Sequence, residues 1–325
     1  MHAPSSLTPF FLAGAVLLLG SCAGSFGHNH IVCQARSPLS PGRTYYYVIR
    51  EESRTFSDEK GEKVSRENGV SLALHCTVTG PATADAVAAN ASAPAHLRIV
   101  CDNLSLHEHS DDDELDMDSE SALESPDPGV RMLAAFDGAE LDGTMDGTGN
   151  LLDLSGLNRV YERMQEPGED HSGQAITWER RLDKTFFTSL LQKTWHIYPD
   201  GEPRTDGEAP TGKSLSIGDS WLLPDTLDAD SHIPLETTYT LVRLRNGILH
   251  FTTRAEVDIR AEKLENTYRN GQVTLKGKQV GFLDVDAATG MVVGGKSTLM
   301  AEGALRMGDV SIPLIIDSTY TVSAS

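Results

Sequence analysis

The stretch Ile248-Leu-His-Phe-Thr-Thr-Arg-Ala-Glu-Val-Asp-Ile259 decides the fold, because it has the period of a β-strand. Its apolar side chains fall on one face and its polar side chains on the other: Leu249, Phe251, Ala255, Val257 and Ile259 against His250, Thr252, Arg254, Glu256 and Asp258. One buried face and one solvated face are typical of an antiparallel sheet. Asn246-Gly247 stands just before the stretch and favours a tight hairpin with residues 237–244.

Similar signals recur along the chain. Further strands are predicted over 44–50, 70–78, 96–103, 130–136, 280–285, 291–299 and 305–321, with a turn at Asn68-Gly69. One helix is predicted from an apolar stripe at Leu157, Val160, Tyr161 and Met164, and a second over 174–193. This order predicts an α+β, mostly β fold: antiparallel β-meanders form a large curved sheet with two central helices packed on it.

The N-terminal segment predicts export. Its apolar run over 10–19 is too short to span a bilayer but suits a signal peptide. Leu19-Gly20-Ser21-Cys22 resembles a bacterial lipobox, although no Lys or Arg precedes it. By this resemblance Cys22 would be acylated, and the protein would be an outer-membrane lipoprotein facing the periplasm or the cell surface. Ordinary cleavage after Ala23, which would give a free secreted protein, is the alternative.

The predicted organisation follows from these signals. Residues 1–21 would be the lipoprotein signal peptide and 22–41 a tether to the membrane. Residues 42–325 would form a single β-rich domain with strands over 42–153, helices over 154–196 and strands over 213–323.

Charge and segment order argue against two classes of function, nucleic-acid binding and nucleotide-cofactor binding. The net charge is −20, from 47 acidic against 27 basic residues, and no Lys/Arg cluster offers a footprint for nucleic acid. No Gly-rich phosphate loop is present, and the chain does not alternate β and α segments, so we expect no cofactor.

The mature chain would keep two cysteines at inward positions of successive strands, Cys76 and Cys101. They could form a disulfide in an oxidising compartment. Two buried free thiols are the alternative interpretation.

Residues 107–127 carry a dense run of acids, with no Lys or Arg between Arg98 and Arg131. Such a run predicts a solvated, mobile loop. Asp111, Asp113 and Asp116 are candidate calcium ligands, but the next glycine is Gly129, and a calcium loop needs an internal turn glycine.

Gly218-Asp-Ser-Trp221 is similar to the nucleophile block of a hydrolase family, with Ser220 as the nucleophile. The block stands late in the chain, and the last histidine is His250, so the expected partner histidine near the C-terminus is missing.

Four segments carry a wider resemblance: Gly42-Arg-Thr-Tyr-Tyr-Tyr47, Ile217-Gly-Asp-Ser-Trp221, Gly281-Phe-Leu-Asp-Val-Asp-Ala-Ala-Thr-Gly-Met291 and Ile312-Pro313. They are similar to segments of an uncharacterised family of bacterial lipoproteins, typical of Bacteroidetes-like organisms. This resemblance implies no activity and no catalytic residues.

We therefore predict a membrane-anchored, non-enzymatic binding protein whose curved sheet could hold an apolar ligand. A secreted hydrolase and a calcium-dependent structural or adhesive module are the alternatives.

Overall fold

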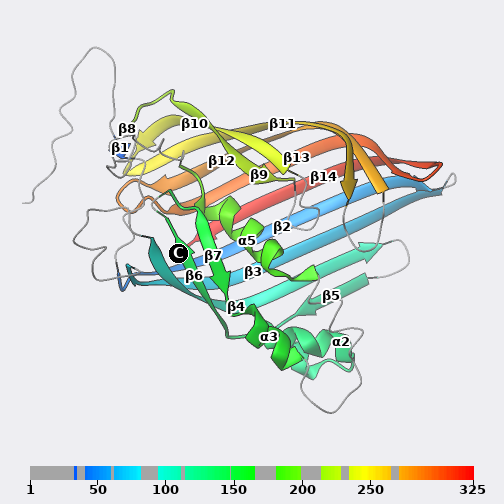
Figure 1. Ribbon diagram of the computed structural model, residues 1–325, viewed down its shortest axis with the longest axis horizontal. Helices are drawn as coiled ribbons and strands as arrows, with labels where there is room; N and C mark the ends of the chain where they lie inside the picture. Colours follow the sequence, from blue (N-terminus) through cyan, green and yellow to red (C-terminus); the bar gives the residue numbers. More distant parts are fainter. Residues whose placement is uncertain are drawn as a thin grey trace, which may run out of the picture.

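The computed structural model describes residues 33–34, 41–59, 62–81, 94–110, 114–146, 148–164, 181–198, 214–227, 234–264 and 271–325. Most of them form one twelve-stranded sheet, in which neighbouring strands are antiparallel (Figure 1). The strand order is β7-β6-β4-β3-β2-β14-β13-β12-β11-β10-β9, with β5 also paired to β4. A separate two-stranded sheet joins β1 (Cys33–Gln34) and β8 (Ser214–Leu215).

The first half of the large sheet holds six strands: β2 (Thr44–Glu59), β3 (Glu62–Pro81), β4 (Ala95–Ser110), β5 (Glu114–Asp118), β6 (Ala139–Met145) and β7 (Leu151–Ser155). The second half holds β9 (Ser220–Thr226), β10 (Pro234–Arg245), β11 (Ile248–Leu264), β12 (Gly271–Asp286), β13 (Val292–Met307) and β14 (Val310–Ala324). The two halves join where β14 pairs with β2, from Leu314 opposite Ser57 to Ala324 opposite Tyr47. The first long strand and the last therefore lie side by side (Figure 1).

The predicted hairpin at Asn246-Gly247 is confirmed. Both residues have positive φ, 51° and 78°, and the strands pair from Arg245 and Ile248 outward. An Asn-Gly pair tolerates this left-handed backbone, which matches the twist of the flanking strands. Along β11 the alternation is as predicted, with Leu249 and Phe251 buried and Thr252 exposed. We call the face that carries Leu249 and Phe251 the inner face of the sheet.

Helices lie on the inner face of the sheet. The principal one, α5 (Lys184–Trp195), begins at Asp183, whose side chain accepts a hydrogen bond from the Phe186 amide. Its apolar side chains pack into the core: Trp195 lies edge-on to Tyr47 of β2, and Phe187 stacks on Phe136. Figure 1 shows α5 crossing the inner face of the sheet.

Shorter helices close the edge of the sheet near β4 and β7: η1 (Ala122–Glu124), α2 (Pro128–Arg131), η2 (Met132–Phe136) and α3 (Leu157–Met164). The predicted helix at 157–164 is confirmed. The second predicted helix, over 174–193, lies partly outside the described residues. In its described part it is interrupted at Leu182 and Asp183, and α5 ends two residues later than predicted, at Trp195. The α+β, mostly β fold is confirmed as an open antiparallel sheet with short helices. Among the described residues, no helix is both long and apolar enough to cross a bilayer.

Three local predictions are wrong. Residues 130–136 are helical, because Asp127 caps the turn that begins at Pro128. Asn68-Gly69 lies within the twenty-residue strand β3 and does not form a turn. In its described part the acidic segment 107–127 is mostly regular structure and not a loop: β4 runs to Ser110, and β5 and η1 fill 114–118 and 122–124.

The acidic segment forms strands because its few apolar residues have the period of a strand. Leu106 and Met117 lie opposite each other and are buried on the inner face. Their neighbours His107 and Asp116 point to the outer face, where carboxylates stay hydrated.

Candidate functional site

The inner face carries two separate apolar clusters. The main core extends from Tyr47 and Leu72 to Val322 and includes the buried side chains of α5 and η2. The second cluster has nine buried members among the described residues: Leu227, Leu235, Ala255, Val257, Ile259, Val273, Leu275, Leu299 and Ala301. Two half-buried side chains of β14, Leu314 and Ile316, pack beside it. We call this second cluster, with Leu314 and Ile316, the trough.

The trough exists because the strands are much longer than the helix. β11, β12 and β13 have 16 or 17 residues each, roughly 50 Å at about 3.3 Å per residue. The twelve residues of α5 span only about 18 Å at 1.5 Å per residue. All members of the trough come from β10 to β14 or from Leu227 just after β9, and none of the described helices contributes a side chain to it.

Glycines let the sheet bend at the trough. A Cβ atom on Gly277 would stand 2.1 Å from the carbonyl oxygen of Met300, and one on Gly303 only 1.8 Å from that of Thr274. Only glycine permits this close approach between β12 and β13. The ends of β11 and β12 beyond this region turn over in Figure 1.

A polar belt separates the trough from the main core. At its centre the Lys193 ammonium lies 3.2 Å from a Glu51 carboxylate oxygen, and both side chains are about nine-tenths buried. The same ammonium lies 5.8 Å from the centre of the Tyr320 ring. The Tyr320 and Thr194 hydroxyls share a hydrogen bond of 2.6 Å. We define the polar belt as Glu51, Lys193, Asp225, Thr237, Thr253, Gln279, Ser318 and Tyr320.

Burial and nearby carboxylates keep the Tyr320 phenol of this belt protonated. Burial raises the pKa of Tyr320 above its ordinary value, the Thr194 hydrogen bond opposes this rise, and the Glu51 and Asp225 charges add to it. The phenol is therefore neutral at physiological pH. The Asp225 carboxylate accepts a hydrogen bond of 3.0 Å from the Thr237 hydroxyl.

A small cavity of about 30 Å³ lies at the belt. Its lining includes Leu227 and Leu299 of the trough and Leu283 and Tyr320 of the main core. The cavity therefore lies where the two apolar clusters meet. It has room for one or two water molecules.

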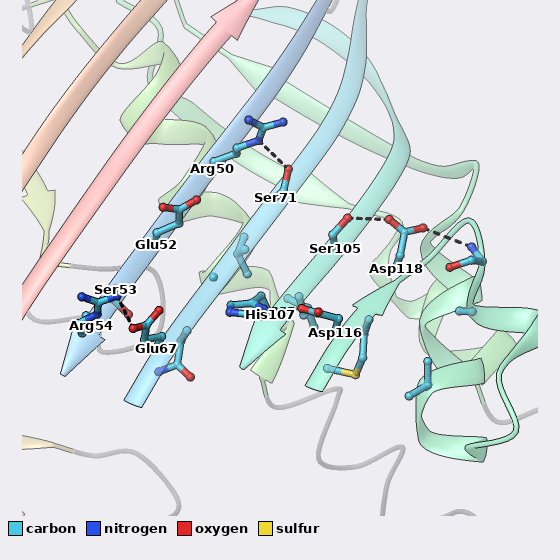
Figure 2. A pocket seen from close by; sticks show the side chains of 18 of the residues that line it. Arg50, Glu52, Ser53, Arg54, Glu67, Ser71, Ser105, His107, Asp116 and Asp118 are labelled. Carbon is cyan, nitrogen blue, oxygen red and sulfur yellow. Dashed lines mark hydrogen bonds and ion pairs between the residues drawn. The ribbon is translucent and has the colours of Figure 1, made fainter. Parts of the chain in front are cut away.

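The outer face carries a far larger groove, of about 1030 Å³, over β14, β2, β3, β4 and β5 (Figure 2). Its walls mix charged side chains with apolar ones, including Ala122 of η1 and Val130 of α2, and some of the charged side chains form pairs. Arg54 forms an ion pair with Glu67, and His107 with Asp116. Arg50 donates to the Ser71 hydroxyl at 3.4 Å, and Ser105 donates to Asp118 at 2.8 Å. Each of these four contacts joins neighbouring strands, β2 to β3 or β4 to β5, and so supports their pairing.

Two groups in this groove have shifted pKa values. The hydrogen bond to Asp116 raises the pKa of His107, because it favours the charged imidazolium. For Asp118 partial burial alone would raise the pKa, but hydrogen bonds from Asn103 and Ser105 outweigh burial and lower it.

The candidate residues from the sequence do not gather into one site. Cys22, Asp111 and Asp113 lie outside the described residues. Asp116 lies in β5, where its carboxylate contacts His107. No group of three or more metal-ligating side chains occurs in the described part of the chain.

Cys76 and Cys101 lie on the inner face of β3 and β4 as buried free thiols. The register pairs Cys76 with Ile99 and Cys101 with Leu74, so the two cysteines are diagonal neighbours. Diagonal Cβ atoms lie roughly 7 Å apart, whereas a disulfide needs about 3.5–4.5 Å. Burial raises the pKa of each thiol to about 12, so both stay protonated.

Ser220 begins the edge strand β9 and is exposed. Its hydroxyl shares a hydrogen bond of 2.7 Å with the Thr240 hydroxyl. A threonine hydroxyl cannot accept the serine proton as a general base does, so this arrangement gives no activated nucleophile.

The sequence interpretation missed the polar belt. The sequence does contain a signal for the polar belt. Thr253 falls between Phe251 and Ala255 on the apolar face of β11, and all the remaining residues on that face from Leu249 to Ile259 are apolar. A single polar residue on a buried face needs a partner or a ligand.

These features define the class of protein: a long, open antiparallel sheet with a helix-covered core and, on the same face, an apolar trough that none of the described helices covers. The chain belongs to a family of unknown function (DUF6263), whose model matches residues 94–292. The predicted membership of an uncharacterised family is thus confirmed, whereas the lipid anchor and the bacterial group remain predictions.

No curated protein matches the chain. Among solved structures, one that describes lipid–protein interactions in lipovitellin is similar over 88% of this chain, with 9% sequence identity and a TM-score of 0.48. This chain spans 25% of the lipovitellin chain.

Proposed function

We propose that this protein is an exported lipoprotein, anchored to the cell envelope through Cys22, that binds an apolar molecule in the trough. The observation that carries the proposal is the trough itself: a second apolar cluster, outside the main core, over which no described helix packs. Leu314 and Ile316 are only half-buried and offer an apolar wall on the β14 side. Ligand sites of this kind are concave, mostly apolar and edged by a few polar groups.

The test of the trough uses two adjacent isoleucines of β14. Ile316 faces the trough, while Ile315 is 50% exposed on the outer face, opposite Phe56 of β2. A carboxylate at position 316 would place a charge on the apolar wall. Ile316→Asp should weaken binding of an environment-sensitive apolar dye at least tenfold, a loss of about 1.4 kcal/mol. Ile315→Asp should leave dye affinity unchanged.

Lipid extraction provides the second half of this test. Protein purified from native membranes should carry an apolar molecule that mass spectrometry detects, and Ile316→Asp should carry less of it. Wild-type protein that binds no dye and carries no lipid, or equal dye binding by the two variants, would contradict the proposal.

The anchor is tested separately by intact mass. Residues 10–22 motivate the expectation that the native protein begins at Cys22 and carries a diacylglyceryl increment. Cys22→Ala should lose the increment and leave the membrane fraction. An unmodified chain beginning at Gly24 would show a free secreted protein, without affecting the trough proposal.

A further inference from the structure

We infer that the polar belt recognises an uncharged, hydroxyl-bearing head group on the molecule bound in the trough. This inference rests on the proposed function and names the chemical class of its ligand: a long-chain alcohol or a glycerol ester, with its hydrocarbon in the trough and a hydroxyl at the belt.

Buried polar side chains at the cavity are the first observation. Gln279, Thr253 and Ser318 are 8%, 7% and 6% exposed. All three line the cavity at the belt. Their polar atoms are not among the sealed polar atoms without a partner in the described part of the chain, so they reach the cavity. A polar group that reaches a cavity takes its hydrogen bonds from water or from a ligand there.

The position of these groups is the second observation. Thr253, Gln279 and Ser318 come from three strands, β11, β12 and β14, and face the same small cavity. Leu227 and Leu299 of the trough line the cavity beside them. A molecule whose hydrocarbon lies in the trough would therefore place its polar end at these groups.

Charge decides which head group fits. The Lys193 ammonium is already opposite the Glu51 carboxylate, and Asp225 adds a second negative charge. A carboxylate head group would face this excess negative charge, and an ammonium would lose its hydration on entering a nearly closed cavity. The three side chains from β11, β12 and β14 carry an amide and two hydroxyls, and a neutral hydroxyl can both donate to them and accept from them.

The size of the cavity limits the head group. About 30 Å³ holds one or two water-sized groups, so one hydroxyl or a small diol fits where water would otherwise lie. Water alone in the cavity is the competing explanation, and the experiment must separate it from ligand recognition.

The experiment measures displacement of the apolar dye by four probes with the same oleyl or oleoyl chain. Monoolein carries hydroxyls, methyl oleate carries none, oleate is anionic and oleylamine is cationic. For wild-type protein we expect monoolein to bind at least tenfold more tightly than each of the other three. Gln279→Leu should remove most of this preference while leaving the affinity for methyl oleate unchanged.

Gln272→Leu is the matched control, because Gln272 lies on the same strand but is exposed. It should keep the wild-type preference. Thr253→Val, which removes one hydroxyl at nearly constant volume, is the second variant if Gln279→Leu does not melt cooperatively; it should lower the affinity for monoolein several-fold.

The outcomes separate the two proposals. Wild-type protein that binds neither the dye nor any probe contradicts the proposed function. Three other results are compatible with a ligand in the trough. The protein could bind dye and methyl oleate without preferring monoolein, it could prefer oleate or oleylamine, or both belt variants could keep the wild-type preference. Each of these results overturns the head-group inference, and the last would show that the preference does not come from the belt.

Discussion

The two parts of the inner face share strands β10 to β14 but have different covers. In the main core, α5 places Phe186, Phe187, Leu190 and Trp195 against the sheet. In the trough the strands continue beyond the described helices, and the cluster consists of strand side chains and Leu227 alone. A second layer is the usual way to bury the apolar face of a sheet. The contrast between these covers is what supports the proposal of a ligand in the trough.

The largest expected effect compares two leucines that are both fully buried, Leu190 of α5 and Leu275 of β12. We expect Leu190→Ala to cost about 4–5 kcal/mol of unfolding free energy, and Leu275→Ala about 2–3 kcal/mol. The reason is that a cavity between helix and sheet stays empty, whereas the trough can relax or admit water. Urea denaturation at equal m-values measures both costs.

Leu222→Ala is the control for this comparison, because Leu222 is exposed on β9 and its loss should change stability by less than about 0.5 kcal/mol. Equal costs at Leu190 and Leu275 would mean that the trough is packed as tightly as the core. The contrast between the two regions would then disappear, and the proposal of a ligand in the trough would lose its support.

Local sequence signals predicted the parts of this fold that local physics determines. Asn246-Gly247 forms its hairpin because two adjacent residues accept positive φ. The stripe at 157–164 becomes α3 for a similarly local reason. The pairing of β2 with β14 joins residues more than 250 positions apart, and nothing in either strand alone specifies the other.

The errors arose where a local signal was overruled by the sheet. Asn68-Gly69 can form a turn, but β3 is paired on both sides there, with Ser53 and Glu52 of β2 and with Glu108 and His107 of β4. The acidic residues of 107–127 suggested a loop. A strand can carry them too, because its outer face is solvated while its inner face is buried. Composition does not reveal alternation, so the charge of the segment hid its strands.

The polar belt was hidden for a different reason. Glu51, Thr253, Gln279 and Ser318 lie on four strands, and the sequence shows each only as one polar residue on an otherwise apolar face. Their proximity depends on the strand order across the whole sheet. A functional site of this kind becomes visible only after the register is known.

The smallest expected effect lies on the outer face of the helix-covered part, where His107 and Asp116 join β4 to β5. The raised pKa of His107 means that the pair adds stability when the imidazole is protonated. This contribution is complete below the unfolded-state pKa of about 6.5 and is lost as pH rises through the folded-state pKa. The side chains are 44% and 69% exposed, so solvent screening limits it to less than about 1 kcal/mol.

Asp116→Asn tests this account of the pair. An imidazole NMR titration should place the pKa of His107 above 6.5 in the wild type and closer to 6.5 in the variant. The stability difference between the two proteins should be larger at pH 5.5 than at pH 8.5. A His107 pKa that does not change in the variant would show that the contact with Asp116 does not hold the charge, and that β5 depends on Met117 and its inner-face packing instead.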